Sequence, residues 1–212
     1  MSTAAVICNG EFPRKEYPRY LISTADYIVC CDGALEKYLR HFSRTPDLVI
    51  GDMDSLPRQL RRKYSSLILH VGEQEHNDQT KAVRHILSAR PDVDTIHIFG
   101  ATGLREDHTV GNLSLLMEYR RMFPGTEVSI DIISDRSTAF AITDSIDLHV
   151  GEGRRFSIFS PDNSLTIKSS GLQWPTDEVI WDNWWKGTLN RATADVVSLV
   201  FSHPSIALVI LD

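Results

Sequence analysis

The stretch Leu48-Val49-Ile50-Gly51-Asp52-Met53-Asp54-Ser55 joins a short apolar run to two aspartates that have one residue between them. Its first three residues are all apolar, which is typical of a strand buried on both faces of a parallel sheet. Leu56-Pro57 follow directly, and a proline is tolerated in the first turn of a helix. The stretch therefore predicts a strand, a polar loop and a helix, which is the repeating unit of an α/β fold.

The same pattern recurs through the first ~135 residues, where apolar runs rich in β-branched residues alternate with segments of helical length. Strands are predicted at 4–8, 27–31, 48–50, 67–71, 95–99 and 128–133. Helices are predicted at 33–42, 57–64, 78–89 and 109–122. Because parallel strands need long crossover connections, this alternation predicts a largely parallel sheet flanked by helices.

The character of the sequence changes after about residue 134, where short strand-like segments are separated by turn residues. Strands are predicted at 138–142, 146–150, 154–159 and 164–168, and no segment from 135 to 212 shows a convincing helical pattern. Residues 195–201 and 206–211 flank Ser202-His203-Pro204-Ser205, which predicts a hairpin. We therefore expect an α/β domain at residues 1–135 and a small antiparallel β domain at residues 136–212.

Composition excludes several classes of protein. The chain of 212 residues has 42% hydrophobic residues and a formal net charge of −6, which argues against a nucleic-acid-binding surface. No apolar run reaches the ~18 residues of a membrane span, and the N-terminus lacks the features of a signal peptide. The three cysteines (Cys8, Cys30 and Cys31) all lie in apolar runs, which favours reduced, buried thiols. We expect a cytoplasmic protein.

Acidic residues follow several of the predicted strands. Because ligands of open parallel sheets bind outside the carboxyl ends of the strands, these residues are expected to converge at one edge. They are Asp32, Asp52, Asp54, Asp78 and Asp107. Five unneutralised carboxylates would raise one another's pKa values and cost stability. A bound Mg²⁺, with a polyphosphate held through it, resolves that conflict.

Each acidic residue also has a structural interpretation. Asp54 or Ser55 could cap the following helix, Asp78 could be an N-cap, and Asp32 could be a turn residue beside Gly33. We expect one or two of the five carboxylates to be structural.

The same choice exists for the neighbouring polar residues. Arg105 could bind phosphate or pair with a nearby aspartate, and Lys81 could turn toward the site or be a solvated surface lysine. His108 could act as an acid or base, or could hydrogen-bond the backbone at its loop-to-helix junction.

The C-terminal part carries all four tryptophans: Trp174, Trp181, Trp184 and Trp185. Aromatic residues in a β domain belong more often to the core or an interface than to a ligand platform. Trp174 lies in the loop-like segment Gly171–Pro175, so it is the best candidate for stacking on a flat ring.

In combination these residues resemble the thiamine pyrophosphokinase family. The motifs that carry the resemblance run in order along the whole chain: Asp32-Gly33-Ala34, Gly51–Ser55, Asn77–Ala82, Gly103–His108 with Asn112, Gly171–Pro175 and Thr188–Asn190. The chain departs from the family pattern at Leu104, where the family has glycine, at Asn77, where it has threonine, and at Leu189, where it has serine. These departures concern substrate binding more than the reaction.

The resemblance implies an α/β domain followed by a β-sandwich domain, and a homodimer whose interface helps build the thiamine sites. It also implies Mg²⁺-dependent transfer of a pyrophosphoryl group from ATP to thiamine, which gives thiamine diphosphate and AMP. The residues implied on the metal are Asp32, Asp52, Asp54 and Asp78. Those implied in catalysis are Arg105, Asp107 and Asp78.

The remaining residues implied by the resemblance contact the two substrates. The ATP side comprises Asn9, Asp32, Gly33, Lys81, Gly103, His108 and Asn112. The thiamine side comprises Trp174, Thr188 and Asn190. Two alternatives stay open at the level of sequence: a metal-dependent phosphohydrolase or nuclease, because clustered aspartates and Mg²⁺ also serve attack by water, and a non-catalytic nucleotide-sensing module.

Overall fold

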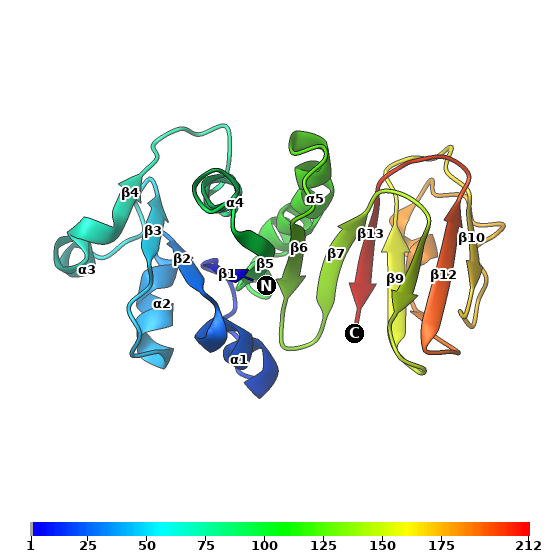
Figure 1. Cartoon of the computed structure of the whole chain (residues 1–212), viewed down its shortest axis with the longest axis horizontal. Coiled ribbons are helices and arrows are strands. Elements are labelled where there is room, and N and C mark those ends of the chain that lie inside the picture. The colour runs from blue at the N-terminus through cyan, green and yellow to red at the C-terminus, as the bar shows by residue number, and fades with distance from the viewer. Residues whose placement is uncertain (1) are drawn as a thin grey trace. The chain divides into compact units, whose positions relative to one another are not determined.

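The computed structural model describes residues 2–212 (Figure 1). The chain divides into two compact units. The first runs up to Leu115 and includes Glu127–Asp135, and the second comprises Leu116–Thr126 and Arg136–Asp212. Within residues 2–212, no helix has the length and apolar character that crossing a membrane requires.

Six parallel strands form the sheet of the first unit. They are β1 (Ser2–Ile7), β2 (Tyr27–Cys31), β3 (Leu48–Gly51), β4 (Ile68–His70), β5 (Val93–Phe99) and β6 (Ser129–Ile133). Their order in the sheet is β4-β3-β2-β1-β5-β6. This confirms the predicted parallel sheet, and each predicted strand lies within about two residues of an observed one.

Helices cover both faces of this sheet (Figure 1). On one face, α1 (Glu16–Thr24) and α2 (Ala34–His41) contribute Ile22, Leu35 and Tyr38 to a core with alternate residues of the strands. Helix α4 (Asp78–Ala89) buries Ala82, Val83 and Ile86 and packs against β1, β2 and β3. Helix α3 (Arg58–Lys63) and a short 3₁₀ turn at Ser65–Leu67 also belong to this unit. Helix α5 (Glu106–Met122) begins in it, and its residues from Leu116 onward belong to the second unit.

Helix α1 is not predicted from the sequence. Pro18 lies near its start, where a proline costs no helical hydrogen bond, and only Pro18 and Ile22 are buried. The apolar spacing is therefore too sparse to signal a helix. Helix α5 begins at Glu106, three residues before the predicted start at Thr109, because the polar residues Glu106, Asp107 and His108 already form its first turn.

The direction in which the chain builds the sheet reverses between β1 and β5. From β1 the chain adds β2, β3 and β4 on one side, and it then returns to add β5 and β6 on the other. Connections on the two sides of such a point diverge and leave a crevice at the carboxyl ends of the two strands. The fold therefore places a crevice between the segments that follow Ile7 and Phe99.

The second unit consists of two antiparallel sheets packed face to face. One has the order β11-β9-β13-β7, and the other has the order β10-β12-β8. The strands are β7 (Thr138–Ile142), β8 (Ile146–His149), β9 (Arg155–Phe159), β10 (Ile167–Ser170), β11 (Asn190–Arg191), β12 (Val196–Phe201) and β13 (Ala207–Leu211). Side chains of both sheets, including Phe156, Ile167, Leu199 and Val209, share one core, so the unit is a β-sandwich.

The predicted hairpin of residues 195–201 and 206–211 is wrong. Strand β12 pairs with β8 and β10, whereas β13 pairs with β7 and β9 in the other sheet. Leu199 and Val209 both point into the shared core from opposite sides. The connection 202–205 therefore crosses from one sheet to the other, and alternation of apolar residues could not distinguish this crossover from a hairpin turn.

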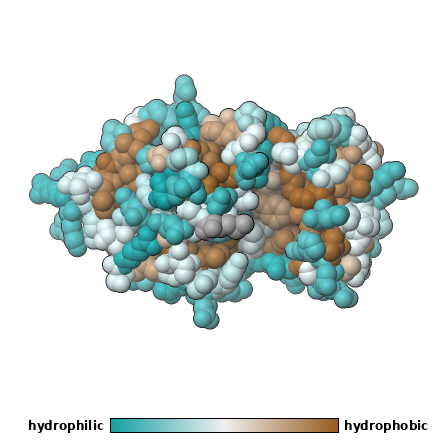
Figure 2. Space-filling view, viewed as in Figure 1, coloured by the Kyte–Doolittle hydropathy of each residue, from teal (hydrophilic) through white to brown (hydrophobic). Residues whose placement is uncertain are grey.

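Smaller differences occur elsewhere in the second unit. Strand β10 begins at Ile167, three residues after the predicted start at Ser164, because Asp162 accepts hydrogen bonds from the Ser164 main chain and hydroxyl and holds a turn there. The two-residue strand β11 and a 3₁₀ helix at Trp184–Gly187 are not predicted. Figure 2 shows hydrophobic residues exposed among hydrophilic ones on the visible face of this unit.

A close approach of two backbones keeps the switch-point crevice in shape. The Gly10 N–H donates to the Gly100 carbonyl at 2.6 Å, and the Glu11 N–H donates to the Thr102 carbonyl at 2.8 Å. A Cβ atom on residue 10 would lie 2.3 Å from the Gly100 oxygen. Only glycine allows this approach.

We predict that Gly10→Ala lowers the free energy of unfolding by about 2–4 kcal/mol, because the added methyl group forces the two loops apart. Gly111→Ala is the matched control, since nothing lies within 4 Å of its added Cβ. Chemical denaturation of both variants measures the difference. Equal stability of the two variants would contradict the proposed role of the close approach.

Candidate active site

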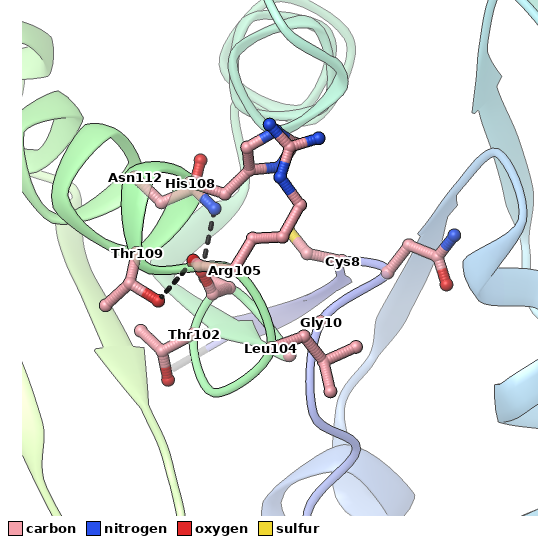
Figure 3. A pocket seen from close by; sticks show the side chains of 11 residues that line it. Cys8, Gly10, Thr102, Leu104, Arg105, His108, Thr109 and Asn112 are labelled. Carbon is pink, nitrogen blue, oxygen red and sulfur yellow. Dashed lines mark hydrogen bonds between the residues drawn. The ribbon is translucent and has the colours of Figure 1, made fainter.

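A cleft of about 310 Å³ lies at the switch point between β1 and β5. Its walls are the segments that follow these two strands and the first turns of α5, as Figure 3 shows. The residues lining it are Cys8, Asn9, Gly10, Gly100, Ala101, Thr102, Leu104, Arg105, His108, Thr109 and Asn112. The cleft is therefore built from the loops that a parallel sheet uses to bind ligands.

A second, more acidic cleft of about 330 Å³ adjoins the first and shares Cys8, Asn9, His108 and Asn112 with it. It is lined by the segments after β2 and β3 and by the start of α4. Four of the five predicted acidic residues line it: Asp32, Asp52, Asp54 and Asp78. Asp107 lies instead in the first turn of α5 and lines neither cleft.

Three of these carboxylates are close enough to share one cation. Each of Asp32, Asp52 and Asp54 has one carboxylate oxygen that lies within 4.8 Å of a carboxylate oxygen of the other two. Asp32 is 5% exposed, and its Oδ1 is buried without a hydrogen-bond partner among the described residues. A buried carboxylate oxygen with no donor is costly, and a hard cation such as Mg²⁺ would satisfy it.

The backbone is strained where it brings these groups together. Asp32 and Met53 have φ values of 44° and 65°, and Gly51 has a φ of 148°. A Cβ atom on residue 51 would lie 2.8 Å from Asp78 Oδ2 and 3.1 Å from Asp32 Cβ. Strain of this kind persists where the surrounding structure enforces it, and it is common at functional sites. Gly51 thus allows two carboxylates to approach across the end of β3.

Burial and mutual repulsion shift the pKa values of this cluster. Burial raises the pKa of Asp32 from 3.8 to about 6. The nearby Asp54 and Asp78 also raise this pKa, whereas the hydrogen bond from the Ser55 N–H lowers it. Burial also raises the pKa of Asp78, with Lys81 opposing the shift. Hydrogen bonds from the Gln74 side chain and the Asp54 N–H lower the pKa of Asp52. The cluster therefore concentrates negative charge that nearby cations only partly offset.

The structure decides two alternatives at the start of α4. The N-cap is Asn77, whose side chain accepts a hydrogen bond from the Thr80 N–H at 3.0 Å, so the N-cap interpretation of Asp78 is wrong. Lys81 is buried and its Nζ lies 3.1 Å from Asp78 Oδ1, so it is not a solvated surface lysine. Both Asp78 and Lys81 instead face the acidic cleft.

Asn112 and Gly33 shape the clefts through packing and hydrogen bonds. The Asn112 amide donates to the Ala101 carbonyl at 2.7 Å and accepts from the Asn77 side chain at 3.0 Å, which joins the loop after β5 to α4. Gly33 precedes α2, and a Cβ there would lie 2.9 Å from Asn9 Nδ2. These contacts make both residues part of the scaffold of the clefts.

Arg105 and Asp107 pair with each other at the start of α5. The Arg105 guanidinium donates to both carboxylate oxygens of Asp107, one of them at 3.1 Å, and this holds the pKa of Asp107 at about 2. Both side chains are about two-thirds exposed. The pairing alternative is therefore the one observed for Arg105, and a competing anion can reach both groups.

The remaining predicted residues of this cleft lie beside that pair. His108 lines both clefts, and Figure 3 shows it in the switch-point cleft. Gly103 has a φ of 95°, and a Cβ there would lie 2.6 Å from Glu11 Cβ. Leu104, where the sequence departs from the family pattern, is 62% exposed at the cleft wall. A bulky residue at position 104 therefore lines the cleft without filling it.

Sequence reasoning missed Thr102 and Thr109 of the switch-point cleft and Gln74 and His76 of the acidic cleft, and it also missed Lys37, which supports the loop after β1. Lys37 on α2 donates to the carbonyl oxygens of Asn9 and Gly10 at 2.6 and 2.8 Å. Partial burial lowers the pKa of Lys37. Its position four residues after Gly33 places it on the same helix face as the Asp-Gly turn, which is the signal that could have identified it.

The three predicted thiamine-side residues come together in the second unit. Trp174, Thr188 and Asn190 line a pocket of about 330 Å³ with Lys186, Pro175 and other residues. The Asn190 side chain accepts from the Trp174 N–H at 3.1 Å and donates to the Trp174 carbonyl at 2.6 Å. Asn190 therefore fixes the backbone of Trp174, whose indole is about half exposed.

The four tryptophans divide between core and surface. Trp181 is 2% exposed and belongs to the core of the sandwich, and Trp184 packs near Phe159. Thr188 donates its hydroxyl hydrogen to the Trp185 carbonyl. Trp185 is 69% exposed but does not line the pocket that contains Asn190, whereas Trp174 is 55% exposed and does line it.

Comparison with known families identifies both parts of the chain. Residues 18–130 match the family described as "Thiamin pyrophosphokinase, catalytic domain", and residues 138–203 match "Thiamin pyrophosphokinase, substrate-binding domain". The chain belongs to the thiamin pyrophosphokinase family.

Individual members of the thiamin pyrophosphokinase family are distant in sequence. The chain is 26% identical over 204 residues to thiamine pyrophosphokinase 1 of Oryza sativa subsp. japonica, covering 82% of this chain and 74% of the relative. It is 32% identical over 139 residues to thiamine pyrophosphokinase of Bacillus subtilis, covering 61% of each.

The fold agrees with solved structures of the thiamin pyrophosphokinase family. A Bacillus subtilis thiamine pyrophosphokinase superposes with a TM-score of 0.79 at 20% identity, covering 100% of this chain and 99% of that one. The Candida albicans protein gives 0.78 at 18% identity, covering 99% of this chain and 88% of that one. At these identities the likeness supports the fold.

The raised pKa of Asp32 predicts a pH dependence of stability in metal-free protein. Between pH 3.8 and about 6 the folded protein holds this proton more tightly than the unfolded chain, so stability falls as pH rises through that window. Asp32→Asn should remove this loss and be more stable than the parent above pH 6, by on the order of 1 kcal/mol.

Denaturant midpoints measured from pH 4 to 8 in EDTA test this prediction. Asp147→Asn, at an exposed position in β8, is the control and should leave the pH profile unchanged. A parent protein that gains stability from pH 4 to 6 relative to Asp32→Asn would contradict the assignment.

Proposed function

We propose that this protein is a thiamine pyrophosphokinase, which transfers the pyrophosphoryl group of ATP to the hydroxyl of thiamine and releases thiamine diphosphate and AMP. The observation that carries the proposal is the cluster of Asp32, Asp52 and Asp54 beside the switch-point cleft, in a chain of this family. Such a cluster suits a metal-bound polyphosphate, and the adjoining cleft has the location expected for a nucleotide.

The donor set fits Mg²⁺. Asp32, Asp52 and Asp54 would hold the ion, with Asp78 beside them across Gly51. When bound, Mg²⁺ neutralises charge on the triphosphate and favours its reaction with a nucleophile. Lys81 orients Asp78 through their 3.1 Å contact and opposes the rise in the Asp78 pKa that burial causes.

Arg105 and Asp107 supply the remaining chemistry in this proposal. A triphosphate in the switch-point cleft competes with Asp107 for the Arg105 guanidinium, which then stabilises charge on the transferred phosphoryl oxygens. Once Arg105 is withdrawn, the pKa of Asp107 returns toward its ordinary value. Asp107 can then accept the proton of the thiamine hydroxyl. At the same time, the hydroxyl oxygen attacks phosphorus of the transferred pyrophosphoryl group and AMP leaves.

The second unit supplies the thiamine side. Trp174 offers a flat apolar surface to the vitamin's rings, and Asn190 holds that surface in place through the Trp174 backbone. We further propose that the active protein is a homodimer, as the family resemblance implies.

Incubation of the protein with ATP, Mg²⁺ and thiamine tests the function. Thiamine diphosphate and AMP should appear together and in equal amounts. Phosphate release without an acceptor would indicate a hydrolase instead, and ATP binding without turnover with any acceptor would indicate a sensing module. Absence of both products with well-folded protein would overturn the proposal.

We predict that Asp52→Asn and Asp54→Asn each lower kcat by about 100-fold or more, because each removes a negative ligand from the polyphosphate-bound cation. Both side chains are partly or fully exposed, so the fold should survive. Asp144→Asn, at an exposed loop position of the second unit, is the control. Near-full activity of either variant at saturating Mg²⁺ would refute the metal assignment.

We predict that Lys37→Met raises KM for ATP about tenfold with a smaller change in kcat, because the Asn9–Gly10 backbone loses two charge-assisted hydrogen bonds. Lys37→Arg should recover part of the loss, since it restores a cationic donor. Lys63→Met, on the exposed α3, is the control. Unchanged KM in Lys37→Met would show that these bonds do not shape the cleft.

A further inference from the structure

The residue between Asp52 and Asp54 has an unusual backbone conformation. Met53 has a φ of 65°, in the left-handed region that residues other than glycine adopt only at a cost. The chain turns there so that the Asp54 N–H donates to Asp52 Oδ1 at 3.2 Å. The conformation of Met53 therefore sets how the two flanking carboxylates lie relative to each other, and any contact that holds Met53 also holds them.

Two contacts hold Met53 in this conformation. The residue is 2% exposed, and its side chain belongs with Leu56 to the core that α1 and α2 share with the sheet. Its carbonyl oxygen accepts a hydrogen bond from Arg61 Nη2 at 2.9 Å. A carbonyl that is shielded from water needs such a donor, because an unpaired buried acceptor costs the free energy of its desolvation.

Arg61 reaches the loop because of the way α3 is anchored. Pro57 directly precedes α3, and the Arg61 N–H donates to the Pro57 carbonyl at 3.0 Å. Leu60 and Tyr64 pack against the same core cluster as Met53. Side chains of a helix lean back toward its N-terminus, so the Arg61 side chain extends toward the loop from which α3 begins.

Hydrogen bonds connect this loop to the third carboxylate of the cluster. Ser55 Oγ donates to Asp54 Oδ1 at 2.8 Å, and the Ser55 N–H donates to Asp32 Oδ2 at 3.0 Å. A displacement of the main chain at Met53 therefore changes the position of Asp54 directly and that of Asp32 through Ser55. The loop places all three carboxylates together.

We propose that Arg61 is a positioning residue for the cation site, because its hydrogen bond to the Met53 carbonyl keeps Asp52 and Asp54 in the arrangement that a hard cation requires. The guanidinium is itself a cation with no acceptor atom, so it is not a ligand. The inference rests on the metal role that the proposed function gives to these aspartates. Removal of a residue that orients metal ligands typically weakens metal binding by about 10- to 100-fold.

The charge of Arg61 and its hydrogen bond affect cation binding in opposite directions. A guanidinium near the site repels a divalent cation, so loss of the charge alone would strengthen binding, by roughly twofold for an exposed group in salt solution. Loss of the hydrogen bond releases the loop and weakens binding. The sign of the change therefore separates a positioning role from a purely electrostatic one.

Titration of Mn²⁺ into the full chain without nucleotide, followed by the EPR signal of the free ion, measures this sign. Mn²⁺ favours the same carboxylate oxygens as Mg²⁺. Arg61→Met should raise the Mn²⁺ dissociation constant about tenfold, whereas Arg61→Lys, which keeps a cationic donor, should recover most of the affinity.

Arg62→Met is the matched control. It removes one positive charge from the same helix, at a side chain that makes no hydrogen bond or ion pair within the described residues 2–212. Its Mn²⁺ dissociation constant should stay within about twofold of the parent value. Asp52→Asn should abolish the same binding, which locates the ion at this loop.

The dependence of turnover on Mg²⁺ gives a second readout. Arg61→Met should need about tenfold more Mg²⁺ for half-maximal activity and should approach the parent kcat at saturating Mg²⁺, since the ligands themselves are intact. A purely structural role would instead lower kcat at every Mg²⁺ concentration in proportion to the folded fraction, which thermal unfolding measures independently.

Unchanged or tighter Mn²⁺ binding by Arg61→Met, or an equal loss in Arg62→Met, would overturn the positioning role and leave the metal assignment in place. Mn²⁺ binding that is absent from the parent protein, or that survives Asp52→Asn, would overturn both. The expected Mn²⁺ results in a protein without transferase activity would refute only the proposed reaction.

Discussion

Repulsion among carboxylates at one edge of the parallel sheet is the constraint on which the first unit depends. Asp32 is buried with one oxygen unpartnered, and Asp52 and Asp54 lie close by. Such an arrangement persists only because Gly51 permits the approach of Asp78 and because Lys81 offsets part of the charge. Under the proposed function, a bound cation and polyphosphate would restore the stability that this repulsion costs.

The neighbouring cleft is maintained by a different kind of force. Backbone hydrogen bonds join the loop after β1 to the loop after β5, and Lys37 holds the same loop from the side of α2. Asn112 adds a third connection between the loop after β5 and the start of α4. These bonds keep the ligand-binding loops in one conformation, which reduces the entropy lost when a ligand binds.

Sequence reasoning was sufficient where a signal was local. Apolar runs of β-branched residues located the six parallel strands, and acidic residues after those runs located Asp32, Asp52, Asp54 and Asp78 at one cleft. It failed where the outcome depended on packing between distant segments. Apolar and polar residues alternate in 195–201 and 206–211 in the same way for a hairpin and for a crossover between two sheets. The contact of Lys37 with Asn9 depends on how α2 packs against the sheet.

The same distinction applies to individual roles in the site. The family pattern indicates Asn190 and Trp174 together, but only coordinates reveal that the Asn190 amide binds the Trp174 main chain. Arg105 and Asp107 are two residues apart, and either a phosphate or the aspartate could occupy the guanidinium. The structure shows the aspartate in place. In these cases the sequence indicated which residues lie close together, and the structure shows which partner each of them contacts.

The position of β13 has a consequence for the order of folding. This strand lies between β7 and β9, yet it follows every other strand of the sandwich in the sequence. During synthesis, β7 and β9 are made first and have no partner between them until β13 leaves the ribosome. Their facing edges therefore stay unpaired until β13 is made, whereas strands β1 to β4 of the parallel sheet can pair in the order in which they are made.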